Sequence, residues 1–141
     1  MTIRKTIFRL SGDGSAALTD TGREPLYGSI DQLRWVPTAQ DTGPSNIGTL
    51  ALFAGKRPID TGLAQTIWSE ASLVLGNDFT RLPRQPAHTT AGVVIDTGND
   101  VSEPVYICGD PLMARFTPGD TGAISGELHV YHGAAGGVGG L

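Results

Sequence analysis

The sequence predicts an all-β protein, an antiparallel β-sandwich or barrel of about seven to nine strands with long loops and little helix. Three observations lead to this fold class. The 141-residue chain contains 20 Gly and 9 Pro, a composition that favours tight turns over long helices. Short apolar or alternating stretches recur at a spacing of roughly ten residues. Apolar residues show almost no helical periodicity.

The first half of the chain contains three strand patterns. Residues 2–10 alternate two sets of side chains, as in a strand with two different faces, and the turn-forming residues 11–15 follow. Residues 29–36 form a second pattern, which ends at Pro37 because proline cannot donate to a strand pair. Residues 48–54 are almost wholly apolar, which is typical of a strand covered on both faces.

The second half is more interrupted. Residues 63–75 suit a helix and a strand equally well, because helix formers surround an apolar centre at Trp68. Further strands are predicted where apolar runs stand between turn residues. These runs cover residues 92–95, 105–108, 112–116 and 126–132. Pro104 is expected to interrupt the chain just before the second of them.

The length of the chain predicts a single domain. We assign residues 1–132 to one β-sandwich domain, with residues 1–10 as an N-terminal strand or arm, and residues 133–141 to a Gly-rich tail. The net charge is −4 and the 10 basic residues are scattered, which argues against nucleic-acid binding. With Cys108 as the only cysteine and no apolar run of the roughly 20 residues that span a membrane, we expect no disulfide, no membrane association and synthesis in a reducing cytoplasm.

The tripeptide Asp-Thr-Gly occurs five times, near residues 20, 41, 60, 97 and 121. The copy that begins at Asp96 follows Val-Val-Ile and locally resembles the catalytic turn of retroviral-type aspartic proteases, which form homodimers to pair two carboxylates. Only 43 residues follow this copy, and they lack the Ile-Gly-Arg-type turn of that family. Because Asp, Thr and Gly all favour turns, we interpret the five copies as turns and keep a homodimeric protease using Asp96 as a remote alternative.

No other set of residues predicts catalysis, a metal site or a cofactor. His129 and His132 are three residues apart on a predicted strand, so they should project from opposite faces. Trp35 and Trp68 lie in apolar stretches, where we expect them in the core. Exposed, they would form a platform for sugar rings, and a carbohydrate- or receptor-binding module is therefore the alternative function.

Two segments carry candidate contact residues. Basic residues gather near the N-terminus, either as an ordinary solvated strand face or as a basic arm that lies on an acidic partner. Residues 80–88 contain two prolines, which predict an extended and largely unpaired backbone, either a surface connection or a segment that docks on a neighbour. The candidate contacts are Arg4, Lys5, Arg9, Arg81, Leu82, Pro83 and Arg84.

Three stretches carry a resemblance to a known family. They are residues 47–54 (IGTLALFA), residues 78–86 (DFTRLPRQP) and the ending from residue 105 to residue 131. Together they resemble the small head-decoration, or cement, proteins of bacteriophages. The resemblance implies a jelly-roll-like β-sandwich without enzymatic activity or cofactors.

The same resemblance implies a location and a partner. The chain would be made in the cytoplasm of a bacterial host and carried on the capsid surface of the virion. Its partner would be the major capsid protein, whose subunits it would bridge and stabilise as a dimer or trimer of its own. The alternative, sugar-binding function would place it in a phage tail.

Overall fold

The computed structural model describes residues 3–22, 25–38, 47–55, 65–86, 91, 102–119 and 123–133. These residues form two antiparallel β-sheets, which confirms the predicted all-β sandwich class. They contain no helix, and hence none that could cross a membrane. The strands are β1 (Ile3–Gly12), β2 (Leu18–Thr21), β3 (Leu26–Pro37), β4 (Ile47–Ala54), β5 (Gln65–Val74), β6 (Phe79–Arg81), β7 (Arg84–Pro86), β8 (Ser102–Asp110), β9 (Leu112–Pro118) and β10 (Ile124–Gly133).

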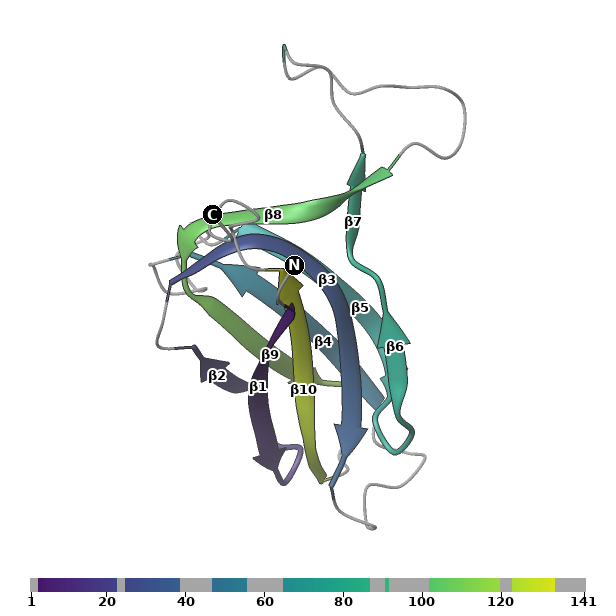
Figure 1. Ribbon diagram of the computed structural model, residues 1–141. Helices are drawn as coiled ribbons and strands as arrows, with labels where there is room; N and C mark the ends of the chain where they lie inside the picture. Colours follow the sequence, from purple (N-terminus) through teal and green to yellow (C-terminus); the bar gives the residue numbers. More distant parts are fainter. Residues whose placement is uncertain are drawn as a thin grey trace.

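The strands are divided between a six-stranded and a four-stranded sheet (Figure 1). The six-stranded sheet has the order β1-β10-β3-β8-β7, with β6 also paired to β3, and the four-stranded sheet has the order β2-β9-β4-β5. The first and last strands lie side by side, because β1 pairs with β10 from Ile3↔Gly133 to Gly12↔Ile124. This pairing places both ends of the described chain at the same end of the sandwich (Figure 1).

The core lies between the two sheets and follows from alternation along the strands. In β10, for example, Leu128 is buried and faces inward, while Glu127 lies on the opposite, outer face. Trp35 of β3 and Phe116 of β9 are among the largest fully buried side chains. Gly126 lies directly against the Trp35 indole, and a Cβ atom at this position would collide with the ring.

Most predicted strands are present. The patterns at 2–10, 29–36, 48–54, 105–108, 112–116 and 126–132 correspond to β1, β3, β4, β8, β9 and β10. The ambiguous segment at 63–75 forms strand β5, so edge pairing with β4 decided what periodicity left open. The predicted strand at 92–95 lies outside the described residues.

Two details of the strand prediction are wrong. Pro104 does not interrupt β8 but lies inside it, opposite Arg84 of β7. At this point β8 has passed beyond its pairing with β3, and an edge position tolerates a residue without an N–H donor. The described residues also contain ten strands instead of about seven to nine, because strands of three or four residues such as β2, β6 and β7 are too short to show a period.

Candidate interaction surfaces

The predicted N-terminal basic cluster is split between the two faces of β1. Arg4 lies on the face that carries the buried Phe8, whereas Lys5 and Arg9 lie on the outer face. All three residues are exposed, but they do not form one continuous patch. Their role as contacts to a partner stays a prediction, and the structure assigns Arg4 and Arg9 to different surroundings.

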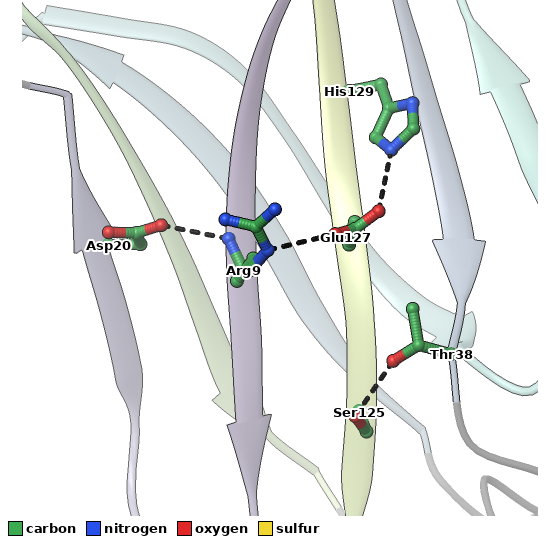
Figure 2. A network of polar contacts seen from close by, with 6 residues as sticks. All are labelled: Arg9, Asp20, Thr38, Ser125, Glu127 and His129. Atoms are coloured by element: carbon green, nitrogen blue, oxygen red, sulfur yellow. Dashed lines mark hydrogen bonds and ion pairs between the residues drawn. The ribbon is translucent and has the colours of Figure 1, made fainter.

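Arg9 belongs to a polar network on the outer face of the six-stranded sheet (Figure 2). Its Nε donates to Glu127 Oε2 at 3.0 Å, and the other carboxylate oxygen of Glu127 lies 3.1 Å from His129 Nε2. The hydrogen bond from His129, followed by that from Arg9, lowers the pKa of Glu127 below its usual range. Figure 2 also shows the hydrogen bond between the Thr38 and Ser125 hydroxyls, which links β10 to the end of β3. The two oxygens are 2.9 Å apart.

The first Asp-Thr-Gly copy is not a turn, which corrects the prediction for residues 20–22. Asp20 and Thr21 are paired with β9 as part of β2. The Asp20 carboxylate accepts a hydrogen bond of 2.9 Å from the backbone N–H of Arg9 (Figure 2). Since β1 is an edge strand, Asp20 satisfies a donor that would otherwise face solvent. The other four copies, including the one at Asp96, lie outside the described residues, so the protease alternative stays untested.

A pocket of about 320 Å³ opens where several strands end together. Arg4, Lys5 and Thr6 of β1 and His132 of β10 line it from the six-stranded sheet. Leu26, at the start of β3, contributes an apolar side chain. Gly22 and Leu112 close it from the four-stranded sheet, where the Gly22 N–H donates to the Leu112 carbonyl at 2.8 Å. The sequence pattern contained no signal for this pocket, because its lining comes from distant parts of the chain.

His132 is the buried polar residue of this pocket. Its Nε2 lies 3.0 Å from the Thr6 hydroxyl, and only 4% of the residue is exposed. Burial lowers the pKa of His132 below its usual value and the positive charge of Arg4 lowers it further, while Asp31 acts in the opposite direction. His129 lies on the outer face of β10, so the expected separation of the two histidines is confirmed.

The predicted unpaired backbone at residues 80–88 is wrong over its described part. Phe79–Arg81 pairs with β3 as β6, and Arg84–Pro86 pairs with β8 as β7. The two prolines are compatible with this pairing, because Pro83 lies between the strands and Pro86 is in the edge strand β7, where one side of the backbone needs no partner. The predicted contact residue Pro83 is buried, whereas Leu82 is 57% exposed and Arg84 is also exposed.

Arg81 connects the two sheets. Its Nε and Nη2 donate to both carboxylate oxygens of Glu70 in β5, at 2.7 and 3.2 Å. The guanidinium also lies 4.9 Å from the centre of the Phe79 ring, an arrangement that favours a cation–π interaction. Arg81 is therefore engaged within the chain, whereas Arg84 is exposed and its Nη1 donates to the adjacent Pro83 carbonyl at 2.8 Å.

Neither tryptophan forms an exposed platform. Trp35 is fully buried and its Nε1 donates to the Leu75 carbonyl at 2.9 Å, which confirms the expected core position. Trp68 is partly buried and packs against the core beside Phe79, with 6.4 Å between the ring centres. Sugar binding through Trp35 would require the core to open.

An exposed apolar row, which the sequence analysis missed, crosses one end of the outer face. Ile3 of β1 lies opposite Gly133 of β10, which in turn lies against Ser29 of β3, and Ser29 is paired with Tyr106 of β8. Ile3 is 63% and Tyr106 60% exposed, and Tyr27, at 53%, is the diagonal neighbour of Tyr106. Alternation in each strand does signal outward positions, but only the strand order places the two tyrosines beside each other and Ile3 on the same end of the face, with Gly133 and Ser29 between them.

The comparisons with known proteins do not identify a family. No family model matches the chain, and no curated protein matches it. Among solved structures, the chain is similar to the cryo-EM structure of the giant freshwater prawn Macrobrachium rosenbergii extra small virus VLP. The two are 10% identical, the match covers 93% of this chain and 79% of that chain, and the TM-score is 0.27. The fold is assigned from the strand pairing.

Proposed function

We propose that the protein is a non-enzymatic structural protein of a phage virion, which binds the outer surface of the capsid and stabilises it by bridging subunits of the major capsid protein. The observation that supports this most directly is the exposed apolar row of Ile3, Tyr27 and Tyr106. Exposed apolar groups that gather at one place often mark a protein interface, and tyrosines are enriched among the residues that dominate binding energy.

The arrangement of the sandwich fits this role. The row occupies the end of a sheet whose inner face is already filled by the core, so a partner can cover the outer face without disturbing the fold. Leu82 and Arg84, at the junction of β6 and β7, are also exposed, and Arg84 lies opposite Pro104, two residues before Tyr106 in β8. These residues extend the exposed contact surface from β8 onto β7, which gives a capsid subunit a broader area to bind.

Binding and bridging are tested on shells assembled from the major capsid protein encoded in the same genome. We expect the purified chain to co-sediment with the shells and to raise the temperature at which they disrupt, because a ligand that binds only the assembled state stabilises it. Tyr106→Ser should weaken binding by about tenfold or more if the tyrosine is a central contact. Absence of the protein from the pelleted shells, together with an unchanged disruption temperature, would refute the proposal.

The matched control is Arg34→Ala. Arg34 is also exposed on the outer face of β3, but it lies opposite His129, away from the apolar row, and pairs only loosely with Asp78 at 3.5 Å. We expect this variant to bind shells like the parent protein. A loss as large as that of Tyr106→Ser would show that the apolar row is not the contact.

A second candidate function, binding of carbohydrate as part of a phage tail, is supported by the same tyrosines. Tyr27 and Tyr106 are exposed aromatic rings next to the polar Ser29 and Asp31, whose side chains share a hydrogen bond of 2.8 Å. Glycan-array binding that is lost in Tyr27→Ser and Tyr106→Ser, without any binding to shells, would favour this function over the first.

A further inference from the structure

The pocket at the end of the sandwich carries an excess of positive charge in an acidic protein. The side chain of Arg4 lies on this side of β1 and has no ion-pair partner among the described residues, whereas Lys5, whose side chain is on the outer face, borders the pocket through its backbone. The whole chain carries a net charge of −4, so the positive charge of Arg4 at the pocket is a local exception. Unpaired cations at the mouth of a cavity raise the local concentration of anions.

The edge of β1 adds a backbone donor to the same place. The N–H of Arg9 donates to Asp20 instead of to β10, and backbone groups alternate between the two sides of a strand. The N–H of Lys5, four residues earlier, therefore also points away from β10, toward the side on which Gly22 and Leu112 close the pocket. β1 has no strand partner on this side among the described residues.

The remaining lining limits what can fit. Thr6 and His132 lie at the inner end and share a hydrogen bond, so the wall there is polar. Leu26 and Leu112 supply an apolar wall. A volume of about 320 Å³ exceeds that of a single anionic group and lies at the lower end of the usual range for small-molecule sites.

We propose that this pocket binds a small molecule through an oxyanion, a phosphate or a carboxylate, held by the side chain of Arg4 and the backbone N–H of Lys5. Arginine presents several N–H groups in a plane that matches the oxygens of either anion. The apolar wall of Leu26 and Leu112 would receive the rest of the ligand. The exposed tyrosines do not line this pocket, and the proposal does not depend on the proposed role in the capsid.

The proposal is tested with inorganic phosphate, phenyl phosphate and succinate, each titrated into the intact protein at an ionic strength held constant with sodium chloride. Heteronuclear NMR spectra should show saturable shifts of the Lys5 and Thr6 amides and of the His132 ring. The His129 ring, on the outer face of the same strand, should stay unshifted. Tighter binding of phenyl phosphate than of inorganic phosphate would support a contact with the apolar wall, and the succinate titration separates carboxylate from phosphate recognition.

Two variants decide the outcome. Arg4→Ala removes an exposed side chain and should weaken binding about tenfold or more, because hydrogen bonds to a charged group are among the strongest. Arg34→Ala, which removes an exposed arginine elsewhere, should leave the affinity unchanged. A spectrum of Arg4→Ala that matches the parent away from the pocket establishes that the fold is kept. Equal affinities of the two variants, or no saturable binding of any probe, would overturn the proposal.

Discussion

The six-stranded sheet has a buried inner face and an outer face, and neighbouring residues of a strand belong to opposite faces. Phe8, Leu128 and Trp35 lie opposite one another and are fully buried. In the next row, Arg9 lies opposite Glu127 and is held by an exposed ion pair. Burial of large apolar groups contributes more to stability than an exposed ion pair does. The inner face therefore holds the fold together, while the outer face is available for binding.

The largest effect expected from this comparison is that of Trp35→Ala. It removes the largest fully buried side chain and leaves the Leu75 carbonyl without its donor. We expect the free energy of unfolding, measured with chemical denaturant, to fall by about 3–5 kcal/mol. Val36→Ala, at the next position on the outer face, is the control and should cost about 1 kcal/mol or less. Similar losses for the two variants would contradict the division between the faces.

A smaller loss is expected for Gly126→Ala, which tests the same part of the core from β10, the strand paired with β3. The added Cβ would collide with the Trp35 ring, and overpacking of this kind costs about 1–3 kcal/mol. Among the described residues, a Cβ added at Gly133 would meet the Ser29 hydroxyl at 3.1 Å and Asp31 at 3.6 Å, so Gly133→Ala should cost less. In a Trp35→Leu background the cost of Gly126→Ala should shrink, and an unchanged cost would show that the indole is not the cause.

The smallest effects concern pH, and they separate the two faces of β10. On the inner face, the pKa of His132 is lowered from 6.5, so below that pH the unfolded chain binds a proton that the folded chain does not. Stability should therefore fall as the pH falls from 6.5 toward the folded pKa. On the outer face, the pKa of Glu127 is lowered from 4.5. Its contribution should be present above pH 4.5 and be lost as the pH falls through the folded value.

Denaturant unfolding as a function of pH checks both windows. His132→Gln should flatten the dependence just below pH 6.5, and Glu127→Gln should flatten the dependence below pH 4.5. If His132→Gln flattens the pH dependence of stability below pH 4.5, or Glu127→Gln flattens it just below pH 6.5, the assignment of the two pH ranges to these groups is incorrect. If neither variant changes the pH dependence in the range assigned to its own residue, the pKa values of His132 and Glu127 in the folded protein are not lowered.

The fold class and the faces of the longest strands could be predicted from the sequence. In β1 and β10 the side-chain period of two separates buried from outward positions over ten residues. Short strands were missed because a segment such as Leu18–Thr21 contains too few residues to establish a period. Asp20 was assigned to a turn for the same reason, since its sequence context is compatible with both a turn and a strand end.

The candidate sites were much less predictable. The basic residues at positions 4, 5 and 9 drew attention as one cluster, yet alternation places Arg4 on the pocket side and Arg9 in the network with Glu127, which is 118 residues away in the chain. Arg81 was expected to face a partner, but its carboxylate partner Glu70 lies in the other sheet. Local patterns cannot reveal a contact between residues that only the strand order brings together.

The sequence alone determined the all-β class, most strand positions, the burial of Trp35 and the opposite faces of His129 and His132. These properties depend on the side chains of neighbouring residues and on the period of a strand. The tertiary structure decided that β1 pairs with β10, that Asp20 covers the free edge of β1, and that Arg4, Lys5 and His132 share a pocket. It also decided that Ile3, Tyr27 and Tyr106 gather on one outer surface, because lateral neighbours in a sheet are set by strand order and register and not by distance along the chain.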